Sequence, residues 1–161
     1  MRAQGPIHLS SARDTVDLGV RMGRLLFTGA VVGLSGPMGA GKTTLARGIA
    51  EGMGIEEGYV VSSPTYTLMQ VYPCGDRQLY HLDLYRIEGP EDLDSTGYRD
   101  AVGPGGVLVV EWVERQPSVL PAENLQVLIR YGNDGRELFL LPAGERYEEL
   151  VRHLLAGQNT P

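Results

Sequence analysis

One short motif constrains this chain more than any other feature. Residues 36–43 read Gly-Pro-Met-Gly-Ala-Gly-Lys-Thr and match the pattern G-x-x-x-x-G-K-[ST] at every fixed position. The apolar run at residues 30–35 before it is typical of a strand buried on both faces, and apolar residues recur at helical spacing from Thr43 onward. Because the motif needs a buried strand before it and a helix after it, this context predicts a phosphate-binding loop in an α/β fold.

The chemistry of phosphate binding explains the residue types in this loop. Glycines without Cβ atoms let several backbone N–H groups point at one phosphate, and the start of the helix adds its positive dipole end. We expect Lys42 to reach the β- and γ-phosphates and the Thr43 hydroxyl to coordinate the Mg²⁺ ion that bridges them. Lys42 is the only lysine in the chain, which uses arginine at its other basic positions. A compact ammonium is therefore favoured at this one place.

Composition limits the remaining possibilities. With 161 residues, 42% of them hydrophobic, the chain is expected to form a single domain over residues 1–161, with frayed ends at 1–5 and 157–161. Cys74 is the only cysteine and has no partner for an internal disulfide. No apolar run approaches the roughly 20 residues that span a bilayer, so we expect a cytoplasmic protein with no membrane association. The net charge of −6 argues against a broad basic face for nucleic acid, so any link to RNA is expected to be indirect.

Apolar periodicity predicts the other elements. A first helix is expected to start after Ser10 or Ser11 and to end near Gly29, and the helix that follows the loop is expected to stop at Gly54. Pro90 begins a short helix, and a last helix carries an apolar stripe from Tyr147 onward. Residues 107–111 resemble a second buried strand. Hairpins are predicted for strands 66–72 and 78–85 around a loop at 73–77, and for strands 125–131 and 137–141 around 133–135. This pattern predicts an α/β, P-loop NTPase-like three-layer domain with a mixed sheet containing hairpins.

Two carboxylates are candidates to complete a nucleotide site. Glu111 ends the strand at 107–111, and ligands of open α/β sheets bind at the carboxyl ends of strands, so we expect Glu111 beside the Thr43 hydroxyl. The alternative is an acid that faces solvent. Asp83 shares one face of its strand with His81 and Tyr85, opposite two leucines, which indicates either the wall of a polar site or an exposed sheet face.

Three further residues are candidates with open alternatives. Pro64 favours an extended chain before it, so Thr65 is either presented to the γ-phosphate or solvated at a strand entry. Arg86 pairs with Asp83, anchors the hairpin or touches phosphate. Trp112, the only tryptophan, directly follows Glu111 and either contacts a partner at the rim of the site or packs beneath the next loop.

The full set of motifs resembles the bacterial TsaE (YjeE) family. Residues 36–44, the Ser-Pro-Thr-Tyr at 63–66, the His-Leu-Asp-Leu-Tyr-Arg at 81–86 and the Glu-Trp at 111–112 occur in that family's order and spacing. The resemblance implies a Mg-dependent ATPase, with ATP and Mg²⁺ as cofactors, that supports threonylcarbamoyladenosine modification of tRNA together with the TsaD and TsaB subunits. It implies Mg²⁺ ligation by Thr43 and Glu111, hydrolysis that depends on Asp83, and an adenine site near Ala12 and Gly135. The residues that it implies for phosphate binding are Met38, Gly39, Ala40, Gly41, Lys42, Thr43 and Thr44.

Other nucleotide-binding functions are less well matched. A small metabolite kinase usually closes a basic lid over the phosphates, and no arginine cluster occurs in a flexible loop here. A GTPase would need the N-K-x-D base reader, which is impossible without a second lysine. A nucleotide-gated assembly module with negligible hydrolysis of its own stays open.

Overall fold

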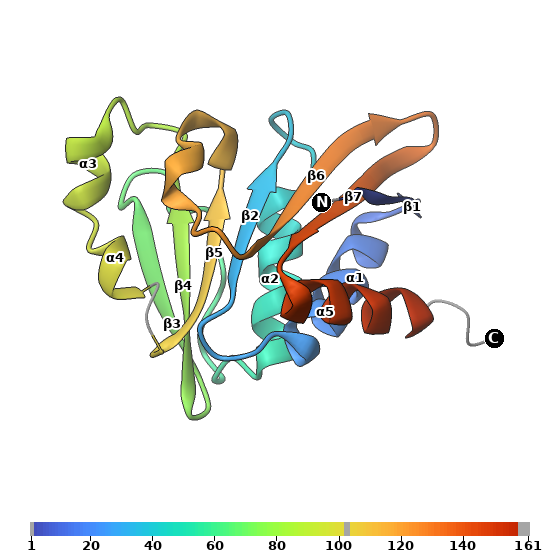
Figure 1. The fold of residues 1–161 in the computed structure, drawn as a ribbon, viewed down its shortest axis with the longest axis horizontal. Coiled ribbons are helices and arrows are strands. Elements are labelled where there is room, and N and C mark those ends of the chain that lie inside the picture. The colour runs from blue at the N-terminus through green and yellow to red at the C-terminus, as the bar shows by residue number, and fades with distance from the viewer. Residues whose placement is uncertain (1, 102–103, 158–161) are drawn as a thin grey trace.

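A computed structural model describes residues 2–101 and 104–157, and within them a seven-stranded sheet forms the centre of the molecule (Figure 1). The strand order is β1-β7-β6-β2-β5-β4-β3. The strands are β1 Gln4–Leu9, β2 Val31–Ser35, β3 Met69–Cys74, β4 Arg77–Asp83, β5 Gly106–Glu111, β6 Asn124–Gly132 and β7 Gly135–Ala143. The pairs β2–β5, β2–β6 and β4–β5 are parallel, and β1–β7, β6–β7 and β3–β4 are antiparallel. The predicted mixed sheet with hairpins is confirmed.

Helices cover both faces of this sheet. They are α1 Ala12–Leu25, α2 Lys42–Met53, α3 Pro90–Asp94, α4 Tyr98–Ala101 and α5 Glu145–Ala156, with short 3-10 helices η1 Val113–Arg115 and η2 Pro117–Val119. Along β5, Val107 and Val109 belong to the core shared with α1, α2 and α5, whereas Leu108 and Val110 belong to the core shared with α3, η1 and η2. The sheet is therefore the middle of three layers, as the sequence predicts.

The helix after the phosphate-binding loop is held in place by close packing against α1. A Cβ atom added to Gly23 would lie 2.2 Å from the Ile49 carbonyl oxygen, and one added to Gly48 would lie 2.3 Å from the Val16 carbonyl oxygen. The two helix backbones approach too closely for any side chain at these points. At its start, α1 is capped by Ser11, whose side chain accepts a hydrogen bond from the Asp14 amide, while the Asp14 carboxylate accepts one from the Ser11 amide.

Two expectations about local structure are wrong. The chain has an edge strand, β1, so Gln4 and Gly5 lie in the sheet rather than in a frayed end. The hairpin expected around residues 73–77 turns instead at Gly75 and Asp76, because Pro73 and Cys74 still pair with β4. Its first strand starts at Met69 rather than at residue 66. The fraying expected at residues 1 and 158–161 concerns positions outside the described residues.

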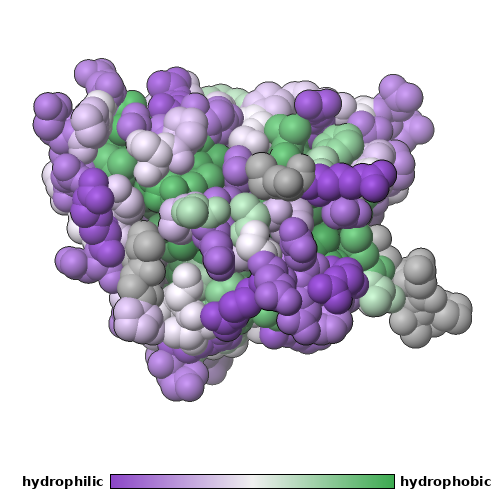
Figure 2. Space-filling model, viewed as in Figure 1, coloured by the Kyte–Doolittle hydropathy of each residue, from purple (hydrophilic) through white to green (hydrophobic). Residues whose placement is uncertain are grey.

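The molecular surface is hydrophilic over α5, where Glu148, Glu149 and Arg152 are exposed (Figure 2). The apolar stripe of this helix, from Tyr147 to Leu154, faces the core as predicted. Among the described residues, none of the helices combines the length and the apolar character needed to span a bilayer.

Candidate functional site

The phosphate-binding loop joins β2 to α2 at the carboxyl end of β2, a central strand that lies between β6 and β5 (Figure 1). Gly36 has φ +144°, and a Cβ atom there would lie 2.3 Å from the Ile129 carbonyl oxygen of β6. Gly41 has φ +113° and is the N-cap of α2. Both positions therefore need glycine, one for its close approach to β6 and one for the left-handed turn into the helix.

The Lys42 ammonium lies inside the curve of this loop. Its Nζ atom donates hydrogen bonds to the carbonyl oxygens of Gly36, at 2.7 Å, and Pro37, at 2.9 Å. The same atom lies 3.9 Å from the centroid of the Trp112 ring. Burial lowers the pKa of Lys42, and the carboxylates of Glu114, Glu111 and Asp83 act in the opposite direction. The lysine is thus a buried cation with acidic groups around it.

Glu111 lies beside the Thr43 hydroxyl, as the sequence predicts. Thr43 Oγ1 donates to Glu111 Oε1 at 2.8 Å and to Oε2 at 3.1 Å. The parallel pairing of β2 with β5 causes this meeting, since it puts the carboxyl end of β5 next to the strand that leads into the loop. Glu111 is 2% exposed, so it is not an acid that faces solvent.

His81 is a second side chain in contact with the Glu111 carboxylate. Its Nε2 atom lies 2.7 Å from Glu111 Oε1, and both side chains are buried. Sequence analysis did not pair these residues, although it placed His81 on the polar face of its strand. The parallel register between β4 and β5, in which His81 aligns with Val109 and Asp83 with Glu111, brings them together.

Asp83 is buried beneath the loop at residues 62–66. Its Oδ2 atom accepts hydrogen bonds from Ser63 at 2.6 Å and Thr65 at 3.2 Å, and its Oδ1 atom accepts one from the Tyr85 amide at 2.8 Å. The side chain is 0% exposed, so the alternative of an exposed sheet face does not hold. Ser63 and Thr65 line the cavity next to the phosphate-binding loop, whereas Asp83 supports them from behind.

Trp112 lies at the edge of the same cavity, packed on an aromatic neighbour. Its ring centroid is 4.9 Å from that of Tyr85, and its backbone has φ +58°, an uncommon value for a residue other than glycine.

Arg86 contacts an aromatic ring. Its guanidinium lies 4.9 Å from the Tyr66 ring centroid, where it anchors the segment that leads into β3. Of the three roles considered for Arg86, this contact matches the structural one.

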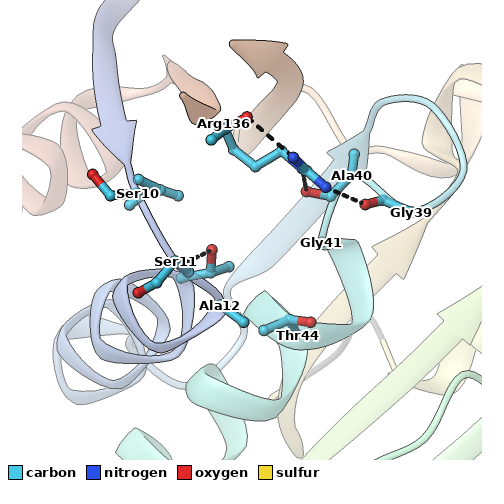
Figure 3. Close-up of a pocket in the computed structure, with 11 residues that line it drawn as sticks. Ser10, Ser11, Ala12, Gly39, Ala40, Gly41, Thr44 and Arg136 are labelled. Atoms are coloured by element: carbon cyan, nitrogen blue, oxygen red, sulfur yellow. Dashed lines mark hydrogen bonds between the residues drawn. The ribbon is translucent and has the colours of Figure 1, made fainter. Parts of the chain in front are cut away.

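Two cavities flank the phosphate-binding loop. The first has a volume of about 330 Å³ and is lined by Met38, Gly39, Gly41, Lys42, Thr43, Thr44, Ser63, Thr65, Tyr85, Glu111 and Trp112. The second has a volume of about 220 Å³ and is lined by Leu9, Ser10, Ser11, Ala12, Thr15, Gly39, Ala40, Gly41, Thr44, Gly135 and Arg136 (Figure 3). The loop is the wall between them, so a ligand with a base at one end and phosphates at the other could occupy both.

The donor atoms present fit Mg²⁺. Thr43 and Glu111 place a hydroxyl and a carboxylate side by side at the mouth of the loop. Mg²⁺ commonly takes one or two such protein ligands and fills its other positions with phosphate oxygens and water. Over residues 2–101 and 104–157, no group of three or more His, Cys, Asp or Glu side chains could hold a metal on its own. Mg²⁺ would therefore bind here together with a phosphate ligand.

Two side chains that the sequence does not indicate contact the loop from the β6–β7 hairpin. Tyr131 donates a hydrogen bond to the Met38 carbonyl, and Arg136 donates to the carbonyls of Gly39 and Ala40. No local pattern marks these residues, since the contacts join segments more than 90 positions apart.

Comparison with known proteins identifies the family. The family model described as threonylcarbamoyl adenosine biosynthesis protein TsaE matches residues 9–138. Proteins named tRNA threonylcarbamoyladenosine biosynthesis protein TsaE are similar to this chain in Treponema pallidum, with 44% identity over 78% of this chain and 90% of the relative, and in Nostoc sp., with 41% identity over 90% of each. The relative from Bacillus subtilis is 41% identical over 81% of each chain.

A solved structure agrees with these matches. The crystal structure of Bacillus subtilis YdiB superposes with a TM-score of 0.79 and 33% sequence identity, and the match covers 98% of this chain and 97% of that one. This match therefore extends beyond residues 9–138, which the family model covers, to the regions of β1 and α5. On the strength of the family model, the relatives and this fold, the chain belongs to the TsaE family.

Proposed function

We propose that this protein, as one P-loop ATPase domain, binds and hydrolyses Mg-ATP in the cytoplasm and so supports threonylcarbamoyladenosine modification of adenosine 37 in tRNAs that read codons starting with adenine. It acts with the TsaD and TsaB subunits, and its own ATP turnover is slow. The observation that carries the proposal is the meeting of Thr43 and Glu111 beside Lys42, because a hydroxyl, a carboxylate and an ammonium at a helix start are what a Mg-nucleotide needs.

Each residue of the site has a separate task in this proposal. Lys42 gives up a hydrogen bond to a loop carbonyl and contacts the β- and γ-phosphate oxygens instead. Residues 38–44 direct backbone N–H groups at the phosphates. Thr43 and Glu111 hold Mg²⁺, which neutralises phosphate charge when it is bound. His81 fixes the position of the Glu111 carboxylate, since its Nε2 atom contacts Oε1, the same oxygen that accepts the shorter hydrogen bond from Thr43.

Asp83 supports hydrolysis from beneath the cavity. Because its carboxylate accepts hydrogen bonds from both Ser63 and Thr65, it fixes where these two hydroxyls point. We assign Thr65 the task of ordering the water or phosphate oxygen nearest to it, with Asp83 as the positioning residue behind it.

The adenine is assigned to the smaller cavity, which Ala12 and Gly135 line. Ala12 can contact a base only through its backbone and methyl group. The acidic charge of the chain supports an indirect contact with tRNA through the partner subunits.

A reconstituted modification assay tests the proposal. Wild-type protein added to TsaD, TsaB, tRNA and the threonylcarbamoyl donor should permit many modification cycles per TsaD centre, and Lys42→Ala protein should not. Equal product formation with the two proteins would contradict the proposed use of ATP. Transfer of phosphate to a small molecule would indicate a metabolite kinase instead.

A further inference from the structure

The β6–β7 hairpin contacts the phosphate-binding loop in a way that the nucleotide chemistry alone does not require. Three successive loop carbonyls, those of Met38, Gly39 and Ala40, each accept a hydrogen bond from a hairpin side chain. The Tyr131 hydroxyl donates to Met38. Arg136 Nη2 donates to Gly39 at 3.1 Å, and Arg136 Nε donates to Ala40 at 3.2 Å (Figure 3).

These two side chains also support each other. The Arg136 guanidinium carbon lies 4.5 Å from the Tyr131 ring centroid, and Arg136 Nη1 donates to its neighbour's carbonyl, Gly135 O, at 3.1 Å. The guanidinium thus has one face on an aromatic ring and its N–H groups spread over three carbonyls. A planar fork with several donors suits this task, whereas a lysine ammonium would not stack and bridge in the same way.

Fixing the carbonyls also fixes the amides. In a planar trans peptide the C=O and N–H groups point in opposite directions, so holding the Met38 carbonyl outward directs the Gly39 N–H inward. The same holds for Ala40 with Gly41, whereas the Ala40 N–H donates to the Pro37 carbonyl within the turn, at 3.1 Å. The Gly39 and Gly41 amides are thereby directed to where a phosphate would bind. Glycine tolerates several backbone conformations, so the hairpin contacts narrow the range open to Gly39 and its neighbours.

We propose that Tyr131 and Arg136 form a clamp that pre-orders the phosphate-binding loop and so sets its affinity for phosphate chains. Both are positioning residues, since they act through the loop backbone rather than on the reacting atoms. The proposal rests on the proposed function, because a pre-ordered loop has a purpose only if phosphates bind to it. A loop that is ordered before binding loses less conformational entropy when the ligand arrives.

Arg136 also lines the cavity assigned to adenine, so the test must separate the clamp from a direct contact with the base. Inorganic tripolyphosphate serves as a probe that has no base. The variants are Tyr131→Phe, which removes only the hydroxyl, and Arg136→Met, which keeps much of the side-chain length. Arg130→Met is the matched control, because Arg130 is an exposed arginine on the same hairpin whose guanidinium lies over Phe139, 5.4 Å from the ring centroid.

Calorimetric titration with Mg-ATP and Mg-tripolyphosphate gives the first readout. Arg136→Met should weaken both ligands by about tenfold to a hundredfold, since it removes charge-assisted hydrogen bonds. Tyr131→Phe should weaken both by about tenfold, and Arg130→Met should change neither by more than about twofold. Loss of ATP affinity without loss of tripolyphosphate affinity would overturn the clamp and make Arg136 a base contact.

Backbone amide spectra of the ligand-free protein give a second readout, independent of nucleotide binding. The resonances of Gly39, Ala40 and Gly41 should broaden or shift in Tyr131→Phe and Arg136→Met but stay unchanged in Arg130→Met. Unchanged loop resonances in the two clamp variants would overturn the proposal. If the wild-type protein does not bind Mg-ATP but the two clamp substitutions still change these resonances, the proposed function is wrong and the clamp remains as a feature of the loop.

Discussion

The Thr43 hydroxyl donates hydrogen bonds to both oxygens of the Glu111 carboxylate, although 68 positions separate the two residues in the chain. The contact joins the start of the α2 helix to the end of the β5 strand, so it depends on the parallel pairing of β2 with β5. A metal ion between these residues and a phosphate would replace this direct hydrogen bond. The proposed Mg²⁺ site is therefore the first property to test.

Thr43→Ala and Glu111→Gln should both reduce the increase in ATP affinity that Mg²⁺ provides. At saturating Mg²⁺ we expect the ATP affinity of each variant to fall about tenfold, because one variant removes a hydroxyl ligand of the metal and the other removes a carboxylate charge. In EDTA the affinity should change by less than about threefold. Calorimetry with and without Mg²⁺ makes the comparison. Equal shifts in both conditions would contradict a shared metal. Glu111→Gln is preferred to Glu111→Ala because an amide still reaches buried His81.

Asp83→Asn should lower the rate of ATP hydrolysis while leaving ATP affinity within about threefold, since the amide keeps the volume of the side chain but loses its charge. The reason is structural: Asp83 reaches the cavity only through the hydroxyls of Ser63 and Thr65. Thr65→Val should reproduce the loss of rate if this is the route. Single-turnover kinetics and calorimetry separate the two quantities, and an equal loss of binding and rate would make Asp83 a direct ligand of metal or phosphate.

Trp112 fluorescence should change when Mg-ATP is added. Its ring lies 3.9 Å from Lys42 Nζ, and a phosphate that binds this ammonium alters the charge next to the indole. The signal has one source, because Trp112 is the only tryptophan. A second change should follow addition of the TsaB–TsaD pair, and Trp112→Ala should weaken partner-stimulated turnover more than nucleotide binding. An indole that responds to neither addition would contradict its place at the site.

Cys74 should react with iodoacetamide about a hundredfold more slowly in the native protein than in the unfolded chain, because the reaction needs an accessible thiolate. Burial raises the pKa of the Cys74 thiol, whose side chain is 2% exposed. The folded state therefore holds a proton that the unfolded state releases above the ordinary thiol pKa of about 8.5. The contribution of Cys74 to the free energy of unfolding falls as pH rises through that value.

Denaturant unfolding at pH 7.5 and at pH 9.5, compared with Cys74→Ala, isolates this effect from the other groups that titrate. The wild type should lose more stability than the variant over this interval. Rapid alkylation of the native protein would show that the thiol is accessible and would contradict the core position.

The sequence predicts the parts of this molecule that depend on local pattern or on strand ends. The loop at residues 36–43 is recognised from its spacing, and Glu111 is placed correctly because parallel strands bring their carboxyl ends together. The three layers follow from buried strands that need cover on both faces.

What the sequence does not predict depends on contacts between distant segments. The strand β1 contains Gly5 and Pro6, which argue against a strand unless it lies at the edge of a sheet, and only the fold puts it there. The depth of Asp83 and the contact of Arg136 with the loop arise from the sheet register and the hairpin position. Periodicity along one segment contains no information about either.

ATP hydrolysis measured with and without the TsaB–TsaD pair is the most direct test of the proposed function. We expect a slow, Mg-dependent rate for the protein alone, stimulation by the pair, and no hydrolysis above background for Lys42→Ala in either condition. An unstimulated rate that Lys42→Ala leaves intact would contradict both the site and its proposed use.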